Sequence, residues 1–422
     1  MMIEQIVNMD SKRRDFIKAF SAMAAAGMFT SGLPWLKEIS AQENVSPVKL
    51  GVIGVGSRGL LLVEHLKLVQ GARITCFCDD YQPHFERAQQ VLGTAAKGYF
   101  DYRDLLEKEE VDGVVIAVPL HEHKRITVDA LDAVLHVFCE KAMAMTYEEC
   151  NEMVKARERN NHILYVGHQR IFNTRILQAV KEIEEGTIGD VTQMRACWHR
   201  NNDWRRPVPS PGLERKINWR MYHEYSRGLM TELASHHLQV TNWVLKDKPD
   251  YVMGSGSINH WKDGREVFDN VNLVYHYPSG THVIYDSLIS NKKYGMEIQA
   301  QGPLGTIEME TGYRYEEQPP PAPGIIQLIT NIEHSVFDAI PIGGASWVPE
   351  DPSEDTGTYL LDRLLKTDGT YIQMESFVSD VRTNRVDPWL TQQGFYASIA
   401  TLMGFEAMMN HRIETWPEGL AI

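Results

Sequence analysis

The chain has 422 residues, which at about 100–200 residues per domain predicts two or three domains. Lysine and arginine number 42 and aspartate and glutamate 56, and this net charge of −14 argues against a nucleic-acid binder. Hydrophobic residues make up 43% and charged residues 23%, as in ordinary globular proteins, and beyond the N-terminal region no apolar run is long enough to span a membrane permanently.

The N-terminal residues resemble an export signal. A twin-arginine motif is similar to residues 13–18, which contain Arg13-Arg14, one spacer and then Phe-Ile-Lys. A moderately apolar stretch follows at 19–29. Small residues around Ser40-Ala41 offer a cleavage point. We expect residues 1–45 to be a twin-arginine signal peptide and linker, which makes the protein periplasmic. The alternative is an amphipathic N-terminal helix of a cytoplasmic protein.

A glycine-rich loop follows the first predicted strand. Residues 48–53 are strand-like, Gly54-Val55-Gly56-Ser57-Arg58-Gly59 reads G-x-G-x-x-G, and 60–69 is helix-like. In this order the first glycine permits a tight turn, the second lets backbone approach a pyrophosphate, and the third permits close helix–strand packing. The start of the helix then offers free N–H groups to phosphate oxygens.

An acidic residue ends the second predicted strand, 73–78. Asp79 is placed to accept hydrogen bonds from the adenosine ribose and to repel the extra phosphate of NADP, which predicts NAD. A helix cap for the segment that starts near Pro83 is the alternative role. The strand also contains two of the five cysteines. Five is an odd number, which leaves no complete set of disulfides, and the spacing of the cysteines does not match a metal site. We therefore expect the cysteines to be packing residues.

Strands and helices then alternate. Strands are predicted at 111–118, 137–141 and 163–166, and helices at 123–135 and 147–160. This alternation predicts a doubly wound parallel sheet, a Rossmann domain over residues 46–170.

The remainder, 171–422, is predicted to be an α+β domain for substrate binding and oligomerisation. A helix at 174–185 precedes strands with few intervening helices, as in a mostly antiparallel sheet. The strands are predicted at 191–198, 251–258, 270–277, 281–287 and 296–301. Residues 201–227 are rich in aromatic and basic residues, which suits carbohydrate binding, and 319–324 and 350–355 are predicted surface loops.

Four motifs together resemble the Gfo/Idh/MocA family of NAD(P)-dependent sugar oxidoreductases. They are the glycine loop, Val118-Pro119-x-x-x-His123, a strand ending in Glu140-Lys141, and the 228–237 segment Gly-Leu-Met-Thr-Glu-Leu-Ala-Ser-His-His. The family's strand usually ends Glu-Lys-Pro, where this chain has Ala142, and its lysine reaches the nicotinamide and the substrate hydroxyl. The family's later motif carries an aspartate and a histidine, which correspond here to Glu232 and His236.

The residue types suit alcohol oxidation. A histidine accepts a proton near neutrality, and a lysine beside it stabilises the developing alkoxide. Glu232 and His236 are four residues apart and share a helix face. We therefore predict catalytic roles for Lys141, His236 and Glu232. The alternative is that Lys141 caps its strand and His236 is an ordinary buried histidine.

The resemblance also implies the binding residues. Cofactor contacts are expected from Gly54, Gly56, Ser57, Arg58, Gly59, Asp79, Pro119, His123, Glu140, Lys141 and Gln169. Substrate contacts are expected from Arg170 and Asn173, although Arg170 pairing with surface carboxylates is an equal alternative. His237, an extra histidine beside His236, is a further substrate-contact candidate, and its alternative role is packing. His121-Glu122-His123 looks like a metal-ligand pattern, but His123 matches an ordinary family position, so no metal is expected.

The sequence therefore predicts an exported enzyme with tightly bound NAD that oxidises or reduces a secondary hydroxyl of a sugar or glycoside. We expect a homodimer or homotetramer without nucleic-acid partners. One alternative is an NAD-dependent glycosidase, as in the exported α-N-acetylgalactosaminidases of the family, which use transient oxidation, elimination, hydration and reduction. The other is a non-catalytic sugar-binding protein.

Overall fold

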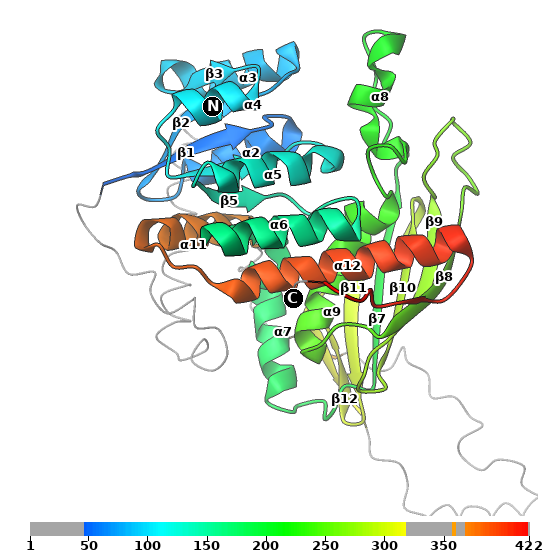
Figure 1. Cartoon of the computed structure of the whole chain (residues 1–422). Helices are drawn as coiled ribbons and strands as arrows, with labels where there is room; N and C mark the ends of the chain where they lie inside the picture. The colour runs from blue at the N-terminus through cyan, green and yellow to red at the C-terminus, as the bar shows by residue number, and fades with distance from the viewer. Residues whose placement is uncertain (1–45, 318–356, 360–367, 421–422) are drawn as a thin grey trace, which may run out of the picture.

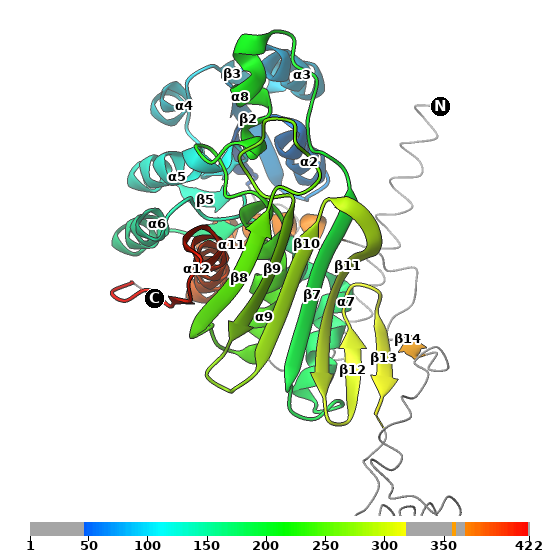
Figure 2. The same cartoon turned by 90° about the vertical axis from the view of Figure 1, so that its right-hand side faces the viewer.

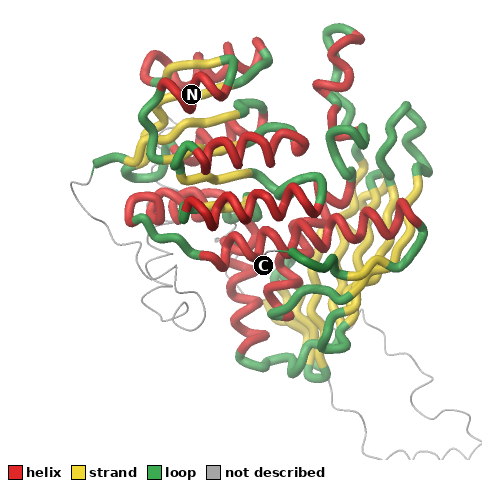
Figure 3. Tube along the Cα trace, in the orientation of Figure 1, coloured by secondary structure: helices red, strands yellow, loops and turns green. Residues whose placement is uncertain are grey.

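The computed structural model describes residues 46–317, 357–359 and 368–420. The signal-like segment and the predicted loops at 319–324 and 350–355 lie outside these residues. Two sheets and a set of helices between and around them make up the described part (Figures 1 and 3). No helix in it is long and apolar enough to cross a membrane.

The first half is a doubly wound sheet of six parallel strands in the order β3-β2-β1-β4-β5-β6, as predicted. The four strands β1, β4, β5 and β6 are largely buried, as parallel strands covered on both faces must be, whereas β2 and the edge strand β3 are partly exposed. The strands are β1 (Val48–Ile53), β2 (Ala72–Cys78), β3 (Lys97–Tyr99), β4 (Gly113–Ile116), β5 (His136–Cys139) and β6 (Leu164–Val166), and the helices are α2 (Ser57–Leu66), α3 (Gln82–Leu92), α4 (Tyr102–Lys108), α5 (His123–Asp132) and α6 (Tyr147–Asn160).

The first helix begins three residues earlier than the sequence predicted, at Ser57. Because of this shift the second and third glycines of the loop lie at the N-terminus of α2, with Gly56 as its cap residue. The five cysteines are free thiols, four of them buried, in agreement with the packing role predicted for them.

The second half contains a nine-stranded sheet in the order β14-β13-β12-β11-β7-β10-β9-β8-β15. All neighbours are antiparallel except β10 and β7, which pair in parallel. The strands are β7 (Gln193–Asn201), β8 (Tyr251–Ser257), β9 (Asn270–His276), β10 (His282–Leu288), β11 (Ser290–Gly302), β12 (Gly305–Glu308), β13 (Tyr313–Glu316), β14 (Thr358–Tyr359) and β15 (Glu414–Thr415).

Helices cover one face of this sheet, while in Figure 2 the other face is turned to the viewer without a covering helix among the described residues. The covering helices are α7 (Thr174–Glu184), α9 (Ser235–Leu245) and α12 (Pro388–Asn410). Because helices cover only one face in the described part, buried and exposed side chains alternate along the strands. Met194 and Ala196 of β7 are buried, and Arg195 between them is exposed.

The last two helices, which were not predicted from the sequence, return to the first half. Helix α11 (Thr370–Thr383) packs against α2, and α12 contacts strands of both sheets. Phe377 of α11 lies edge-on to Phe138 and Tyr165, and a buried phenylalanine contributes roughly 1.5–3 kcal/mol. The end of the chain thus holds the two halves together.

Candidate functional site

A cavity of about 1330 Å³ lies between the carboxyl ends of the parallel strands and the second half of the chain. Ligands of doubly wound sheets bind at this edge, because the loops that follow the strands converge there. The cavity exceeds the ~300–1,000 Å³ of a site for one drug-sized ligand, so it has room for a dinucleotide and a second molecule.

The glycine loop forms one wall. Gly54 has a φ of +85°, and a Cβ there would lie 2.7 Å from the Ala117 carbonyl, so no other residue fits. A Cβ on Gly59 would lie 1.9 Å from the Gly54 oxygen, which explains the close approach of helix to strand. Helix α2 has no side-chain cap and no acidic residue in its first turn. Its free N–H groups therefore suit a phosphate anion.

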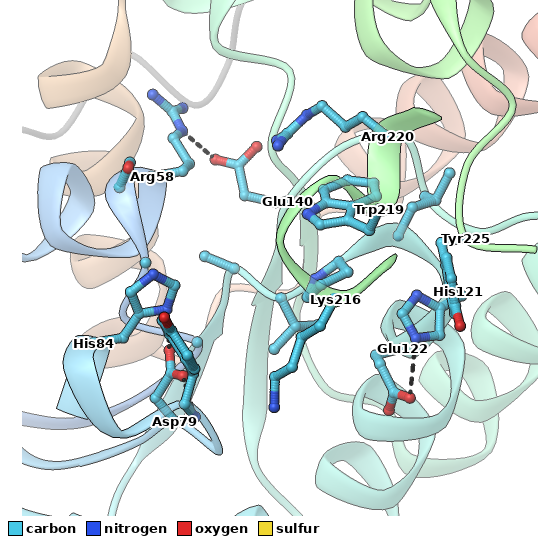
Figure 4. A pocket seen from close by; sticks show the side chains of 18 of the residues that line it. Arg58, Asp79, His84, His121, Glu122, Glu140, Lys216, Trp219, Arg220 and Tyr225 are labelled. Atoms are coloured by element: carbon cyan, nitrogen blue, oxygen red, sulfur yellow. Dashed lines mark hydrogen bonds and ion pairs between the residues drawn. The ribbon is translucent and has the colours of Figure 1, made fainter. Parts of the chain in front are cut away.

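Asp79 lies at the tip of β2, on the same wall. Its Oδ2 accepts from the Val55 N–H at 2.8 Å and its Oδ1 from the Tyr81 N–H at 2.9 Å. His84 lies 3.4 Å from the same carboxylate (Figure 4). Each carboxylate oxygen retains a second lone pair, so Asp79 can still accept hydroxyl donors from the cavity. These features fit the ribose and pyrophosphate of a dinucleotide.

Glu140 and Lys141 follow β5 at the centre of the cavity. Glu140 accepts from Arg58 Nε at 2.7 Å, which ties the end of β5 to the first turn of α2 (Figure 4). Lys141 Nζ donates to the carbonyls of Glu232 at 2.7 Å and Thr231 at 3.2 Å. Two of its three donors are used in this way, and one remains for a ligand. Burial lowers the pKa of Lys141 to about 8, although nearby Glu232 and Glu140 raise it.

Glu232 lies in a π-helical turn, Met230–Ala234, which leads into α9, and His236 lies in the first turn of α9. Such turns are frequent at functional sites. Glu232 accepts from Arg220 Nε at 2.6 Å. Burial would raise the pKa of Glu232, but the charges of Arg220 and Lys141 outweigh it and lower the pKa. Glu232 is therefore ionised at neutral pH.

His236 is buried to 6% exposure, and its Nδ1 has no hydrogen-bond partner among the described residues. Burial, with the charges of Lys141 and Arg170, lowers its pKa well below the usual value. The ring is therefore neutral at physiological pH, so one ring nitrogen carries a lone pair that can accept a hydrogen bond from a hydroxyl. It lies edge-on to His168, at 5.9 Å between centroids, and 5.8 Å from the ring of Trp198.

The structure brings most of the predicted site residues together. Those that line the cavity are Gly54, Gly56, Ser57, Arg58, Asp79, Pro119, His123, Glu140, Lys141, Gln169, Glu232 and His236. Gly59 lies behind the wall. His123 borders the cavity, but its two ring nitrogens contact the carbonyls of Ala142 and Val118 at 2.9 and 3.1 Å. Its side chain therefore positions the loops around Lys141 rather than offering a free nitrogen to a ligand.

Three predicted substrate contacts are placed elsewhere. Arg170 is buried, pairs with Glu310 at 2.6 Å and lies over Trp198, so its partner is a carboxylate in the interior rather than at the surface. The Asn173 side chain caps α7 by accepting from the Arg175 N–H. His237 is fully buried and packs on Trp198 and Tyr285. None of the three lines the cavity.

The cavity has further lining residues that the sequence did not single out. Trp198 and Arg200 come from β7, and Trp204, Arg206, Lys216, Trp219 and Arg220 come from the 201–227 segment. Lys216 reaches across to Asp80 beside the glycine loop, with 2.8 Å between Nζ and Oδ2. In Figure 4 Lys216, Trp219 and Arg220 face Asp79 and Arg58 across the cavity. The aromatic and basic composition of 201–227 was the only signal for this wall.

A dinucleotide-type loop on a doubly wound sheet, with a lysine and a histidine in the cavity at the junction with a second sheet domain, is typical of two-domain nucleotide-dependent oxidoreductases. The family models agree. The oxidoreductase family model with an NAD-binding Rossmann fold matches residues 48–168, and the GFO/IDH/MocA C-terminal domain matches 176–308. The chain belongs to the Gfo/Idh/MocA oxidoreductase family.

Among its relatives, myo-inositol 2-dehydrogenase of Thermotoga maritima is 25% identical over 62% of this chain and 74% of its own length. A glycosyl hydrolase family 109 protein of Shewanella amazonensis is 30% identical over 58% of each chain. With several curated relatives the alignment covers a little under three fifths of the relative. Levoglucosan dehydrogenase, solved with NADH and levoglucosan, shares the fold with a TM-score of 0.67, at 17% identity over 88% of this chain and all of that one.

Proposed function

We propose that this protein is an NAD-dependent dehydrogenase that oxidises or reduces a secondary hydroxyl of a sugar or glycoside. The observation that carries the proposal is that Lys141 and His236, from the two halves of the chain, line the same cavity, with Lys141 bonded to the turn that leads to His236. Inositol and sugar dehydrogenases among the relatives support it.

The residues suit the proton half of the reaction. Oxidation of a secondary alcohol removes a hydride from carbon and a proton from oxygen, and NAD, when bound, supplies the hydride acceptor. Neutral His236 accepts the hydroxyl proton. The free donor of Lys141 holds the alkoxide oxygen as charge develops on it. Glu232, fixed by Arg220, positions the turn that supports both groups and can accept a hydrogen bond from a neighbouring hydroxyl.

The test is to incubate the purified protein with NAD and a panel of methyl glycosides and inositols while following the absorbance of reduced nicotinamide. Reduction of NAD by at least one member supports the proposal. No redox change with any member, either with NAD or with a dye acceptor, contradicts it.

A second candidate is an NAD-dependent glycosidase, which the 30% identity to a family 109 glycosyl hydrolase favours. In this reaction the hydride returns within one turnover, so no net NADH forms. Release of nitrophenol from nitrophenyl glycosides without net NADH would replace the dehydrogenase proposal with this one.

We also propose that the protein is exported with its nucleotide already bound. Arg13-Arg14 supports a twin-arginine route, which carries folded proteins. The periplasm offers no free NAD pool, so the nucleotide must be held tightly. Assembly as a homodimer or homotetramer stays a prediction.

A further inference from the structure

Two arginines of the cavity wall have no acidic partner among the described residues. They are Arg200, at the end of β7, and Arg206, in the loop that follows. The other lining arginines are paired with carboxylates: Arg58 with Glu140, Arg103 with Asp101, Arg125 with Glu122, Arg215 with Glu224 and Glu266, and Arg220 with Glu232. Two positive charges on this wall are thus left without a carboxylate.

Both arginines flank the predicted reacting groups. The Arg200 guanidinium lies 5.2 Å from the ring centroid of Trp198, and the same ring lies 5.8 Å from His236. Arg206 lies close to Arg220, the partner of Glu232, because the Arg206 N–H donates to the side chain of Asn218, two residues before Arg220. Both arginines therefore line the same cavity as Lys141 and His236.

The local backbone holds this wall in place. The Arg206 N–H donates to Asn218 Oδ1 at 2.7 Å, and Asn218 Nδ2 donates back to the Arg206 carbonyl at 3.0 Å. Asn218 is only 2% exposed. Arg200 follows Ala196 and Trp198 on the inward face of β7, which keeps its side chain on the cavity side.

The dinucleotide gives no reason for these charges. Its pyrophosphate is expected at the N-terminus of α2, beside Arg58, on the wall that the first half forms. Arg200 and Arg206 come from the second half, where Arg200 lies over Trp198 and the Arg206 backbone bonds to Asn218. Arg200 is half-buried and Arg206 is exposed, so water solvates both guanidinium groups and both are free to bind an anion that enters the cavity.

We propose that the substrate is an anionic sugar, with a carboxylate or a sulfate ester that Arg200 and Arg206 bind while Lys141 and His236 act on a hydroxyl. Planar guanidinium groups bind both anions through two parallel hydrogen bonds. Trp198 and Trp204 provide aromatic surface for the sugar ring beside them. This assignment rests on the proposed dehydrogenase function for the reaction, but not for the binding.

The experiment compares matched neutral and anionic ligands on the purified full chain. The pairs are methyl glucoside with methyl glucuronide, methyl galactoside with methyl galacturonide, and each neutral glycoside with its 6-sulfate. Turnover is followed by reduced nicotinamide, and equilibrium binding by calorimetry, which needs no reaction. The variants are Arg200→Gln and Arg206→Gln. Arg195→Gln is the control, because Arg195 lies on the same strand but is exposed on the opposite face.

We expect the anionic member of at least one pair to be favoured by about 10- to 100-fold in kcat/KM and in affinity, as charge-assisted hydrogen bonds allow. Arg200→Gln should remove most of this preference, mainly through KM, and Arg195→Gln should not. The uronide and sulfate arms identify which anion is bound.

Equal binding of neutral and anionic ligands would overturn the proposal, and so would loss of nucleotide affinity in Arg200→Gln to the same degree as sugar affinity. If no sugar is turned over but an anionic one binds and loses affinity in Arg200→Gln, the dehydrogenase function fails while this inference stands.

Discussion

Replacing Lys141 by methionine tests the catalytic role and the burial of the lysine at once. Methionine keeps the length of the side chain and removes the donor that holds the alkoxide, so turnover should fall on the order of 100- to 1000-fold while NAD stays bound. A loss below about tenfold would make Lys141 a structural residue.

The same substitution should change the pH dependence of stability. Burial lowers the pKa of Lys141 from 10.5 to about 8. A pKa unit corresponds to about 1.4 kcal/mol, so keeping the proton costs the folded wild type about 3 kcal/mol at pH 7. Between the two pKa values the unfolded chain binds more protons than the folded one, and stability therefore rises with pH. At pH 9.5 the cost is about 1 kcal/mol.

The measurement is urea-induced unfolding of wild type and Lys141→Met at pH 7 and pH 9.5, with equal nucleotide content. Relative to the variant, the wild type should gain about 2 kcal/mol over this interval. Lost packing and the lost bonds to the Thr231 and Glu232 carbonyls are independent of pH and cancel in this difference. Lys141→Arg is the control, since arginine stays protonated at both pH values and should show the same relative change as methionine. A difference between wild type and variant that does not change with pH would refute the burial argument.

Three further predictions concern the cofactor and export. Asp79→Asn keeps one acceptor oxygen for the Val55 and Tyr81 N–H groups but loses the negative charge, so the preference for NAD over NADP should weaken. An unchanged ratio of NAD to NADP affinity would show that Asp79 does not contact the ribose. The native protein should retain NAD(H) through gel filtration. Lys216→Ala removes the exposed contact to Asp80, so this variant should release bound NAD(H) faster in a chase with unlabelled nucleotide. A protein that purifies without nucleotide and binds NAD only at millimolar concentration contradicts tight binding. Changing Arg13-Arg14 to Lys-Lys should leave the protein in the cytoplasm by fractionation, and normal export of that variant would exclude the twin-arginine route.

The sequence by itself determined the nucleotide half. A parallel strand, its glycine turn and the next helix are neighbours in the chain, so the roles of Gly54 and Gly59 follow from local sterics. Asp79 follows β2 and Lys141 follows β5 of the same sheet, and the carboxyl ends of parallel strands lie at one edge even though β1 and β4 separate these two. The spacing of Glu232 and His236 likewise placed both on one side of their turn and helix.

Tertiary structure decided which neighbours face the cavity. His236 and His237 are adjacent, and only packing against Trp198 and Tyr285 determines that His236 borders the cavity and His237 is enclosed. Arg170 could equally have faced a substrate, but Glu310, 140 positions away, pairs with it in the interior. Such long-range pairs leave no periodic signal in the chain.

The same holds for the wall that faces the nucleotide. The composition showed that 201–227 is aromatic and basic, but it could not predict which arginines pair with carboxylates. Arg220 forms a salt bridge with Glu232, while Arg200 and Arg206 have no acidic partner among the described residues. A charge is left without a partner only when the fold has placed every nearby acid elsewhere, and that depends on three-dimensional packing rather than on the order of residues.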